Sequence, residues 1–93
     1  MVRAFVLYEE QPDPVRYAEH AELCRSVPGA VFRHGRVFGA PVGEPAHRYY
    51  AEFEWPDLES FTVAAASAEF VQTGRDALTL GVRFAVEFVD LAG

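Results

Sequence analysis

The sequence predicts an α+β domain in which strands and helices alternate around one antiparallel sheet. Four segments are rich in β-branched and aromatic residues, as strands are, and the stretches between them space their apolar residues as helices do. Clusters of proline and glycine separate the segments. Ninety-three residues suffice for one core, and no repeat or linker divides them, so we expect a single domain over residues 1–93.

The chain begins with a strand and a helix. Val2–Tyr8 is dense in β-branched, aromatic and aliphatic residues, which predicts the first strand. Asp13 then offers an N-cap oxygen and Pro14 is preset for the first helical position. Apolar residues recur at helical spacing after this point. These signals predict a helix over about Pro14–Ser26, which the pair Pro28-Gly29 ends.

Two strands follow, joined by the longest loop of the chain. Ala30–Phe38 places Val31, Phe32, Val37 and Phe38 among polar residues and predicts the second strand. A turn-rich connection over residues 39–45 leads to His47–Trp55, where apolar and polar residues alternate. That alternation predicts the third strand.

The last part of the chain predicts two short helices and a strand. Pro56-Asp57 opens a helix with an alanine-rich end, and Ser67 caps a further short helix that Gly74 is expected to end. Leu78–Leu91 carries apolar residues at a spacing of two and predicts the fourth strand.

This order folds with right-handed crossovers into the ferredoxin-like βαββαβ arrangement, a four-stranded antiparallel sheet with its helices on one face. The other face is not clearly polar. The first strand is apolar on both sides, and Ala85 and Val89 fall on the outer side of the fourth. We therefore expect a second copy of the chain to cover this face, as a homodimer.

The composition argues against several classes of protein. A net charge of -6 and the absence of a basic cluster argue against nucleic-acid binding. No segment has the length of a membrane span or the pattern of a secretory signal. Cys24 is the only cysteine, so no intrachain disulfide forms, and on the apolar stripe of its helix it is expected to be an inert packing residue. We expect a cytoplasmic protein.

His20 is the candidate catalytic residue. It shares the inward stripe of the first helix with Tyr17 and Cys24, so its imidazole should face the sheet. An imidazole in such a place can transfer a proton to or from a bound molecule. The alternative is a core histidine that only satisfies its hydrogen bonds.

Further side chains are candidate contacts for a small hydrophobic or oxygenated ligand. Tyr17 has the strongest claim because it shares the face of His20, and Tyr8, Tyr49 and His34 complete the set. Tyr49 and Tyr50 must point to opposite faces, so only one can line a given pocket. Core or interface packing, or a surface position for His34, is the alternative. No metal is expected, because the three histidines lack a ligand spacing, and no cofactor is expected.

Several segments together resemble the EthD family of the dimeric α+β barrel superfamily, and the resemblance covers nearly the whole chain. They are Phe5–Tyr8, Asp13-Pro14, Tyr17–His20, Pro28-Gly29, Arg36–Gly39, Ala51–Trp55, Leu58–Ser60 and Ser67–Glu69. The resemblance implies two sheets that face each other in a dimer, with a pocket between sheet and helices in each monomer. His20 matches the family's histidine on the first helix by its distance from Pro28-Gly29.

A resemblance to this superfamily indicates the fold more firmly than the reaction. Its relatives include cofactor-independent monooxygenases, cyclases and isomerases, which implies an enzyme that uses His20 as acid or base on a small hydrophobic or aromatic molecule. Other relatives bind haem. The alternatives are therefore a non-catalytic small-molecule or haem-binding module, or an accessory protein of an oxidative degradation pathway.

Overall fold

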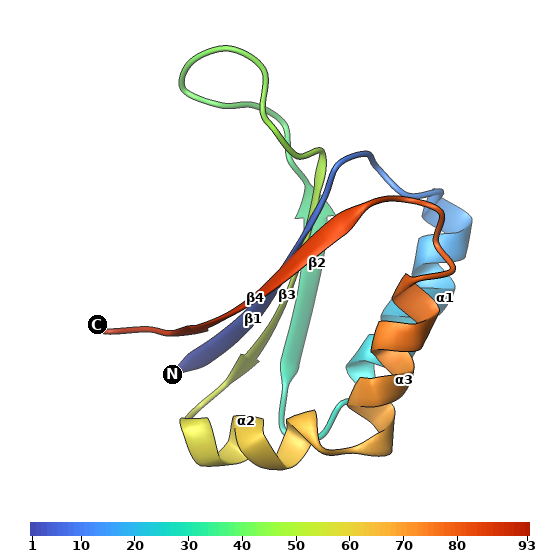
Figure 1. Ribbon diagram of the computed structural model, residues 1–93. Helices are drawn as coiled ribbons and strands as arrows, with labels where there is room; N and C mark the ends of the chain where they lie inside the picture. Colours follow the sequence, from blue (N-terminus) through green and yellow to red (C-terminus); the bar gives the residue numbers. More distant parts are fainter.

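The computed structural model describes residues 1–93 and confirms the predicted α+β class (Figure 1). Each strand and helix falls where the sequence predicts one. The elements are β1 (Val2–Tyr8), α1 (Pro14–Arg25), β2 (Val31–Arg36), β3 (Tyr49–Trp55), α2 (Leu58–Ala65), α3 (Ala68–Ala77) and β4 (Phe84–Asp90).

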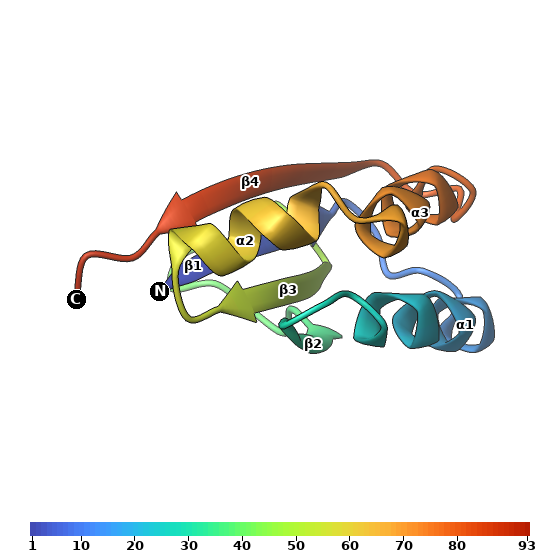
Figure 2. The same cartoon turned by 90° about the horizontal axis from the view of Figure 1, so that it is seen from below.

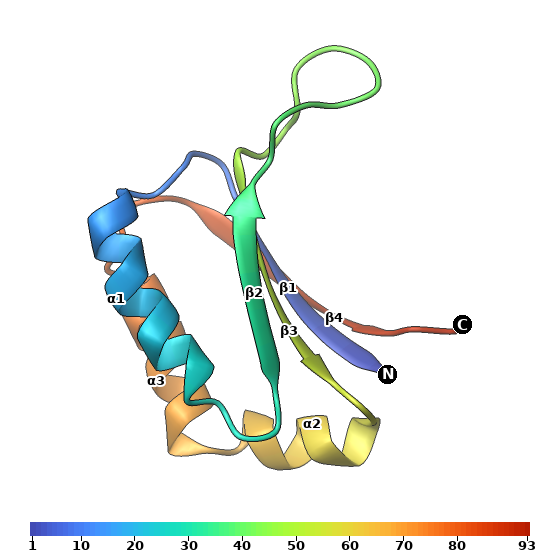
Figure 3. The same ribbon diagram turned by 180° about the vertical axis from the view of Figure 1, so that it is seen from behind.

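The four strands form one antiparallel sheet in the order β2-β3-β1-β4, the ferredoxin-like arrangement that the sequence predicts. Helices α1 and α3 lie side by side and run in opposite directions over one face of this sheet (Figures 1 and 3). Helix α2 lies apart from them, at the end of the sheet where β3 leaves it (Figure 2). The start of α1 is therefore beside the end of α3.

Some predicted boundaries are wrong. Gly74 does not end α3, because its backbone is not in the left-handed region and the helix continues to Ala77. Residues 78–83 are not strand: Thr79 and Leu80 donate their backbone N–H to the end of α3, and Gly81 turns the chain with a φ of 75°. The second strand ends at Arg36, because the chain beyond it leaves the sheet as a projecting loop (Figure 1).

The core lies between the sheet and the helices. Trp55 is fully buried at the end of β3, where its indole N–H donates to the carbonyl oxygen of Pro28. Phe61 and Phe70 pack edge-on against the same ring. Trp55 therefore joins β3, the end of α1 and both later helices in one cluster.

The opposite face of the sheet carries apolar and charged side chains together. Its apolar part consists of Phe5, Leu7, Tyr50, Val89 and Leu91. Beside it, two arginines and two glutamates from neighbouring strands pair with one another: Arg3 with Glu52 and Glu54, and Arg33 with the same two carboxylates. We call these residues together the outer face. The prediction that this face is not clearly polar and carries apolar residues is confirmed.

None of the three helices has the length and apolarity required to cross a lipid bilayer.

Replacing Trp55 tests how much the core cluster contributes to the free energy of unfolding. We expect Trp55→Phe to lower the free energy of unfolding by about 2 kcal/mol, because it removes part of a buried ring and leaves the Pro28 carbonyl without its donor. Phe38→Ala, at a side chain that is 87% exposed, should change it by less than about 0.5 kcal/mol. Urea unfolding at equal protein concentration measures both, and equal losses in the two variants would contradict the expectation.

Candidate functional site

Helix α1 begins at a residue that fixes the direction of its side chains. The carboxylate of Asp13 accepts a hydrogen bond from the backbone N–H of Arg16 at 2.9 Å, and Pro14 occupies the first helical position. With this start, Tyr17, His20 and Cys24 lie on the buried stripe, as predicted. His20 is 3% exposed, so its imidazole belongs to the interior.

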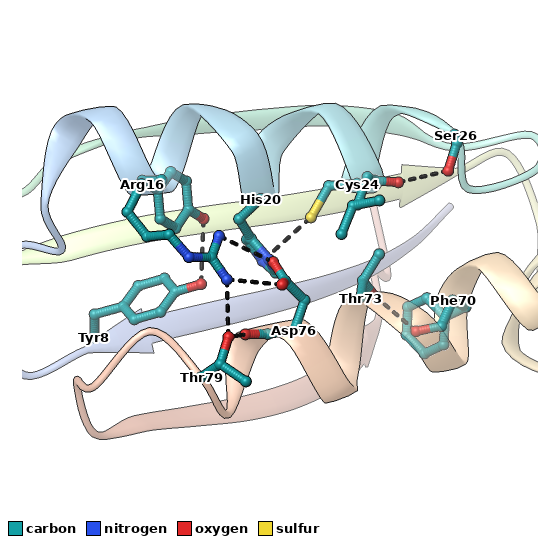
Figure 4. Close-up of polar contacts among 11 residues, drawn as sticks. Tyr8, Arg16, His20, Cys24, Ser26, Phe70, Thr73, Asp76 and Thr79 are labelled. Atoms are coloured by element: carbon teal, nitrogen blue, oxygen red, sulfur yellow. Dashed lines mark hydrogen bonds and ion pairs between the residues drawn. The ribbon is translucent and has the colours of Figure 1, made fainter.

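The imidazole of His20 is paired with a carboxylate from α3. Its Nδ1 lies 2.8 Å from Oδ2 of Asp76. Asp76 is held in turn by Arg16, which donates two hydrogen bonds to the carboxylate at 2.7 and 3.3 Å and a third to Thr79. Figure 4 shows Asp76 between the guanidinium and the imidazole. One carboxylate thus joins two groups of α1 to the end of α3.

The charges of this cluster decide which nitrogen of His20 carries a proton. The hydrogen bonds from Arg16 hold the pKa of Asp76 below its ordinary value, and the one from His20 acts in the same direction, against the opposing effect of burial. The carboxylate is therefore ionised at neutral pH and can only accept, so Nδ1 of His20 must donate. In the neutral ring the lone pair then lies on Nε2.

The thiol of Cys24 lies next to Nε2 of His20. Its Sγ lies 3.4 Å from Nε2 of His20. Burial raises the pKa of the Cys24 thiol to about 12, so the sulfur keeps its hydrogen and donates it weakly to the imidazole. A thiol is a poor donor, and a ligand that offers a better one can replace it.

A cavity of about 230 Å³ opens between the sheet and α3, beside His20. Ten of its thirteen lining residues are hydrophobic, and His20, Cys24 and Tyr8 form part of its wall. Small residues make the space: Gly74 of α3 lines it, and a methyl group placed there would meet no atom within 4 Å. The remaining lining residues are Ala4, Val6, Phe53, Phe70, Thr73, Ala77, Phe84, Val86 and Phe88.

The structure brings only part of the predicted set to this cavity. Tyr8 lines it and is fully buried, and its hydroxyl lies 3.2 Å from that of Tyr17. Tyr17 does not line the cavity itself; it stands behind Tyr8 and faces a second, more polar groove. Tyr49 and His34 lie on that groove, where Nδ1 of His34 is 2.6 Å from the Tyr49 hydroxyl.

Sequence reasoning missed Asp76 and Arg16. The available signal was that Asp76 stands in the last turn of a helix, where the helix dipole disfavours an anion. An anion in that place needs a cation or a donor from elsewhere, and here α1 supplies both.

The described residues include no group of three or more His, Cys, Asp or Glu side chains arranged to hold a metal ion. The site itself offers one imidazole, paired with a carboxylate, on the wall of an apolar cavity.

The fold and the cavity define a ferredoxin-like α+β domain with a pocket between sheet and helices. The chain is similar to an ethyl tert-butyl ether D (EthD) family protein from Bacillus halodurans, with 28% identity and a TM-score of 0.81 over 99% of each chain. The predicted resemblance to the EthD family is thereby confirmed.

Two more distant structures share the fold. One is a dimeric ferredoxin-like protein of unknown function from a Jannaschia species, with 16% identity and a TM-score of 0.73 over 97% of this chain and 98% of that one. The other is SnoaB of Streptomyces nogalater, a cofactor-independent oxygenase, with 18% identity and a TM-score of 0.62 over 99% and 93%. The sequence matches no protein-family model and no curated protein.

The lowered pKa of Asp76 predicts how acid acts on the fold. A carboxyl group whose pKa is lower in the folded than in the unfolded chain adds stability above its ordinary value of 3.8, and this stability is lost as the pH falls through the folded value. We expect Asp76→Asn to unfold at neutral pH with less denaturant than the parent chain, and to lose less further stability on acidification. Asp90→Asn, at an exposed carboxylate without an ion pair, is the control and should follow the parent curve.

Proposed function

We propose that the chain is an enzyme without metal or organic cofactor, which transfers a proton to or from a small hydrophobic or aromatic molecule by means of His20. One observation carries the proposal: His20 is a buried imidazole on the wall of an apolar cavity, and Asp76 holds its orientation through Nδ1. General bases of this kind contribute about 10²–10⁴ to a rate.

The chemistry follows from the hydrogen bonds. A substrate in the cavity replaces the Cys24 thiol at Nε2 and gives up a C–H or O–H proton to the imidazole. The imidazolium that forms is stabilised by Asp76, whose charge is held in place by Arg16. The same proton then returns from Nε2 to another atom of the substrate. The cyclase and isomerase types include such a transfer, whereas the monooxygenase type shares only the removal of the first proton and needs dioxygen as its oxidant.

The comparisons support the enzyme class without naming a reaction. SnoaB shows that this fold serves a cofactor-independent oxygenase in another protein. The size of the cavity favours a small organic substrate over haem, because about 230 Å³ lies below the volume of ~300–1,000 Å³ that encloses a drug-sized ligand.

A chromogenic proton-transfer probe tests the role of His20. 5-Nitrobenzisoxazole is a small aromatic molecule that opens to a coloured nitrophenolate once a base removes its C–H proton. We expect the protein to accelerate this opening, and His20→Ala to reduce the rate by about a hundredfold or more. His47→Ala, at a histidine outside the cavity, should keep the parent rate. Circular dichroism must show both variants folded, and equal rates in His20→Ala and the parent chain would refute the proposal.

We further propose that the chain forms one domain over residues 1–93 and pairs with a second copy through the outer face. The apolar part of this face supplies a surface for a partner, and its charges are already paired, which lowers the cost of covering them. Proteins of the same fold from Jannaschia and Thermobifida fusca are described as dimeric.

A charge introduced into the apolar part of the outer face tests the pairing. Leu7 stands between Tyr50 and Ala85 in the sheet, so we expect Leu7→Lys to convert a dimer into a monomer at micromolar concentration. Val63→Lys places the same charge on an exposed position of α2 and should stay dimeric. Sedimentation equilibrium measures the mass, and a parent chain that is monomeric at this concentration would exclude the homodimer.

A further inference from the structure

The cavity beside His20 has an incomplete wall at one edge of the sheet. β4 is an edge strand, and its inward-facing side chains Val86 and Phe88 line the cavity although they are 44% and 57% exposed. Their partners on the neighbouring strand β1, Val6 and Ala4, line the same cavity and are only 8% and 1% exposed. Exposure therefore rises sharply across one strand spacing, which places the opening of the cavity at β4.

Helix α3 forms the opposite side of this opening. Figure 2 shows α3 on the β4 side of the molecule and α1 on the β2 side. Gly74 of α3 lines the cavity and is exposed, and Val71 and Leu78 lie on the same side of the helix, three residues before it and four after it. Both are exposed as well, at 45% and 76%. We call Val71, Gly74, Leu78, Val86 and Phe88 together the seam.

The backbone gives no reason for a glycine at position 74. Glycine in a helix interior lowers stability relative to alanine, and it is retained where a positive φ or a close approach excludes a side chain. Gly74 meets neither condition, because its φ is not positive and a Cβ placed on it would meet no atom within 4 Å. A side chain there would occupy the open space of the seam, so the glycine keeps that space free.

We propose that the ligand of this cavity is longer than the cavity itself, and that Gly74 determines how long it can be. One end of the ligand lies beside His20, and the remainder lies in the seam over Gly74. The seam is continuous with the cavity, because Gly74, Val86 and Phe88 line both. This inference rests on the function proposed above and names its substrate class, an elongated apolar molecule such as an aromatic ring that carries an alkyl chain.

The seam matches such a molecule in chemistry as well as in shape. Apart from the glycine its side chains are aliphatic or aromatic, and none of them is charged. At the α2 end the rings of Phe61 and Phe88 are 4.9 Å apart and close the space, which leaves the direction toward Leu78 for the longer end of the ligand. The hydroxyl of Thr73 in the lining already donates to the carbonyl oxygen of Phe70. Affinity in the seam therefore comes from the burial of apolar surface.

Two phenols that differ only in chain length test this inference. In 4-ethylphenol and 4-hexylphenol the hydroxyl can donate to Nε2 of His20, and the second has four more methylene groups for the seam. Calorimetric titration of the full chain gives the ratio of their dissociation constants, 4-ethylphenol over 4-hexylphenol. A fully buried methylene improves affinity about fourfold, so we expect a ratio of about 15 when the seam buries half of each methylene.

A side chain at position 74 should remove most of this gain. We expect Gly74→Leu to lower the ratio about fivefold, because the leucine fills the seam. Gln72→Leu adds the same side chain at an exposed position of α3 outside the cavity and should keep the parent ratio. The inference is overturned if both variants or neither lower the ratio, or if the parent chain binds neither phenol. Should Gly74→Leu bind neither, Gly74→Ala must lower the ratio about twofold, and an unchanged ratio overturns the inference.

A stability measurement separates this role from a structural one. Gly74→Ala should unfold at a higher urea concentration than the parent chain, because alanine favours the helix and nothing obstructs its methyl group. A glycine that served the fold would give a destabilised variant instead, and that result would overturn the inference. Sedimentation equilibrium tests for another occupant: if Gly74→Leu turns a dimer into a monomer and leaves the ratio unchanged, a second copy covers the seam and the inference fails.

The ratio reports binding and not proton transfer, so this inference and the proposed function can fail separately. A ratio that depends on Gly74, in a chain that does not accelerate the opening of 5-nitrobenzisoxazole, would retain the seam and reject proton transfer. Accelerated opening of 5-nitrobenzisoxazole with a ratio that does not depend on Gly74 would do the reverse.

Discussion

The hydrogen bond between His20 and Asp76 is the interaction on which the candidate site depends. It joins α1 to the last turn of α3, where the helix dipole disfavours a carboxylate. Arg16 offsets that cost with two hydrogen bonds. In exchange, the carboxylate fixes the ring orientation and the tautomer of His20. Without it, the imidazole would be one more buried polar side chain with no defined direction.

The parts of the fold that local sequence determines could be predicted, and the parts set by packing could not. The alternation in β3 and the cap at Asp13 are local, so their positions follow from the sequence, and the inward direction of His20 follows from the cap. Asp76 is 56 residues away from His20, and only the relative placement of two helices brings them together. The start of β4 was misplaced for a related reason: the spacing of two continues through residues that turn back from α3.

The cavity exists because small residues stand where larger ones would fill the core. Ala4 on β1 and Ala77 and Gly74 on α3 all face it, and Gly74 is kept inside a helix although glycine costs about 1 kcal/mol there relative to alanine. Close packing is the rule in protein interiors, and an apolar space bordered by a buried imidazole departs from it. The departure is local, since Trp55 is fully buried and does not line the cavity.

The site joins two halves that are fixed by different constraints. Tyr8 belongs to the sheet, where it is paired with Tyr49 on one side and Phe84 on the other. A slip of one residue in either register would turn its hydroxyl to the outer face, so the register of a central strand protects its direction. His20 belongs to the helices and is positioned by Asp76. The hydroxyls of Tyr8 and Tyr17 meet across this boundary, and the hydrogen bond between them joins the central strand to the helix that carries His20.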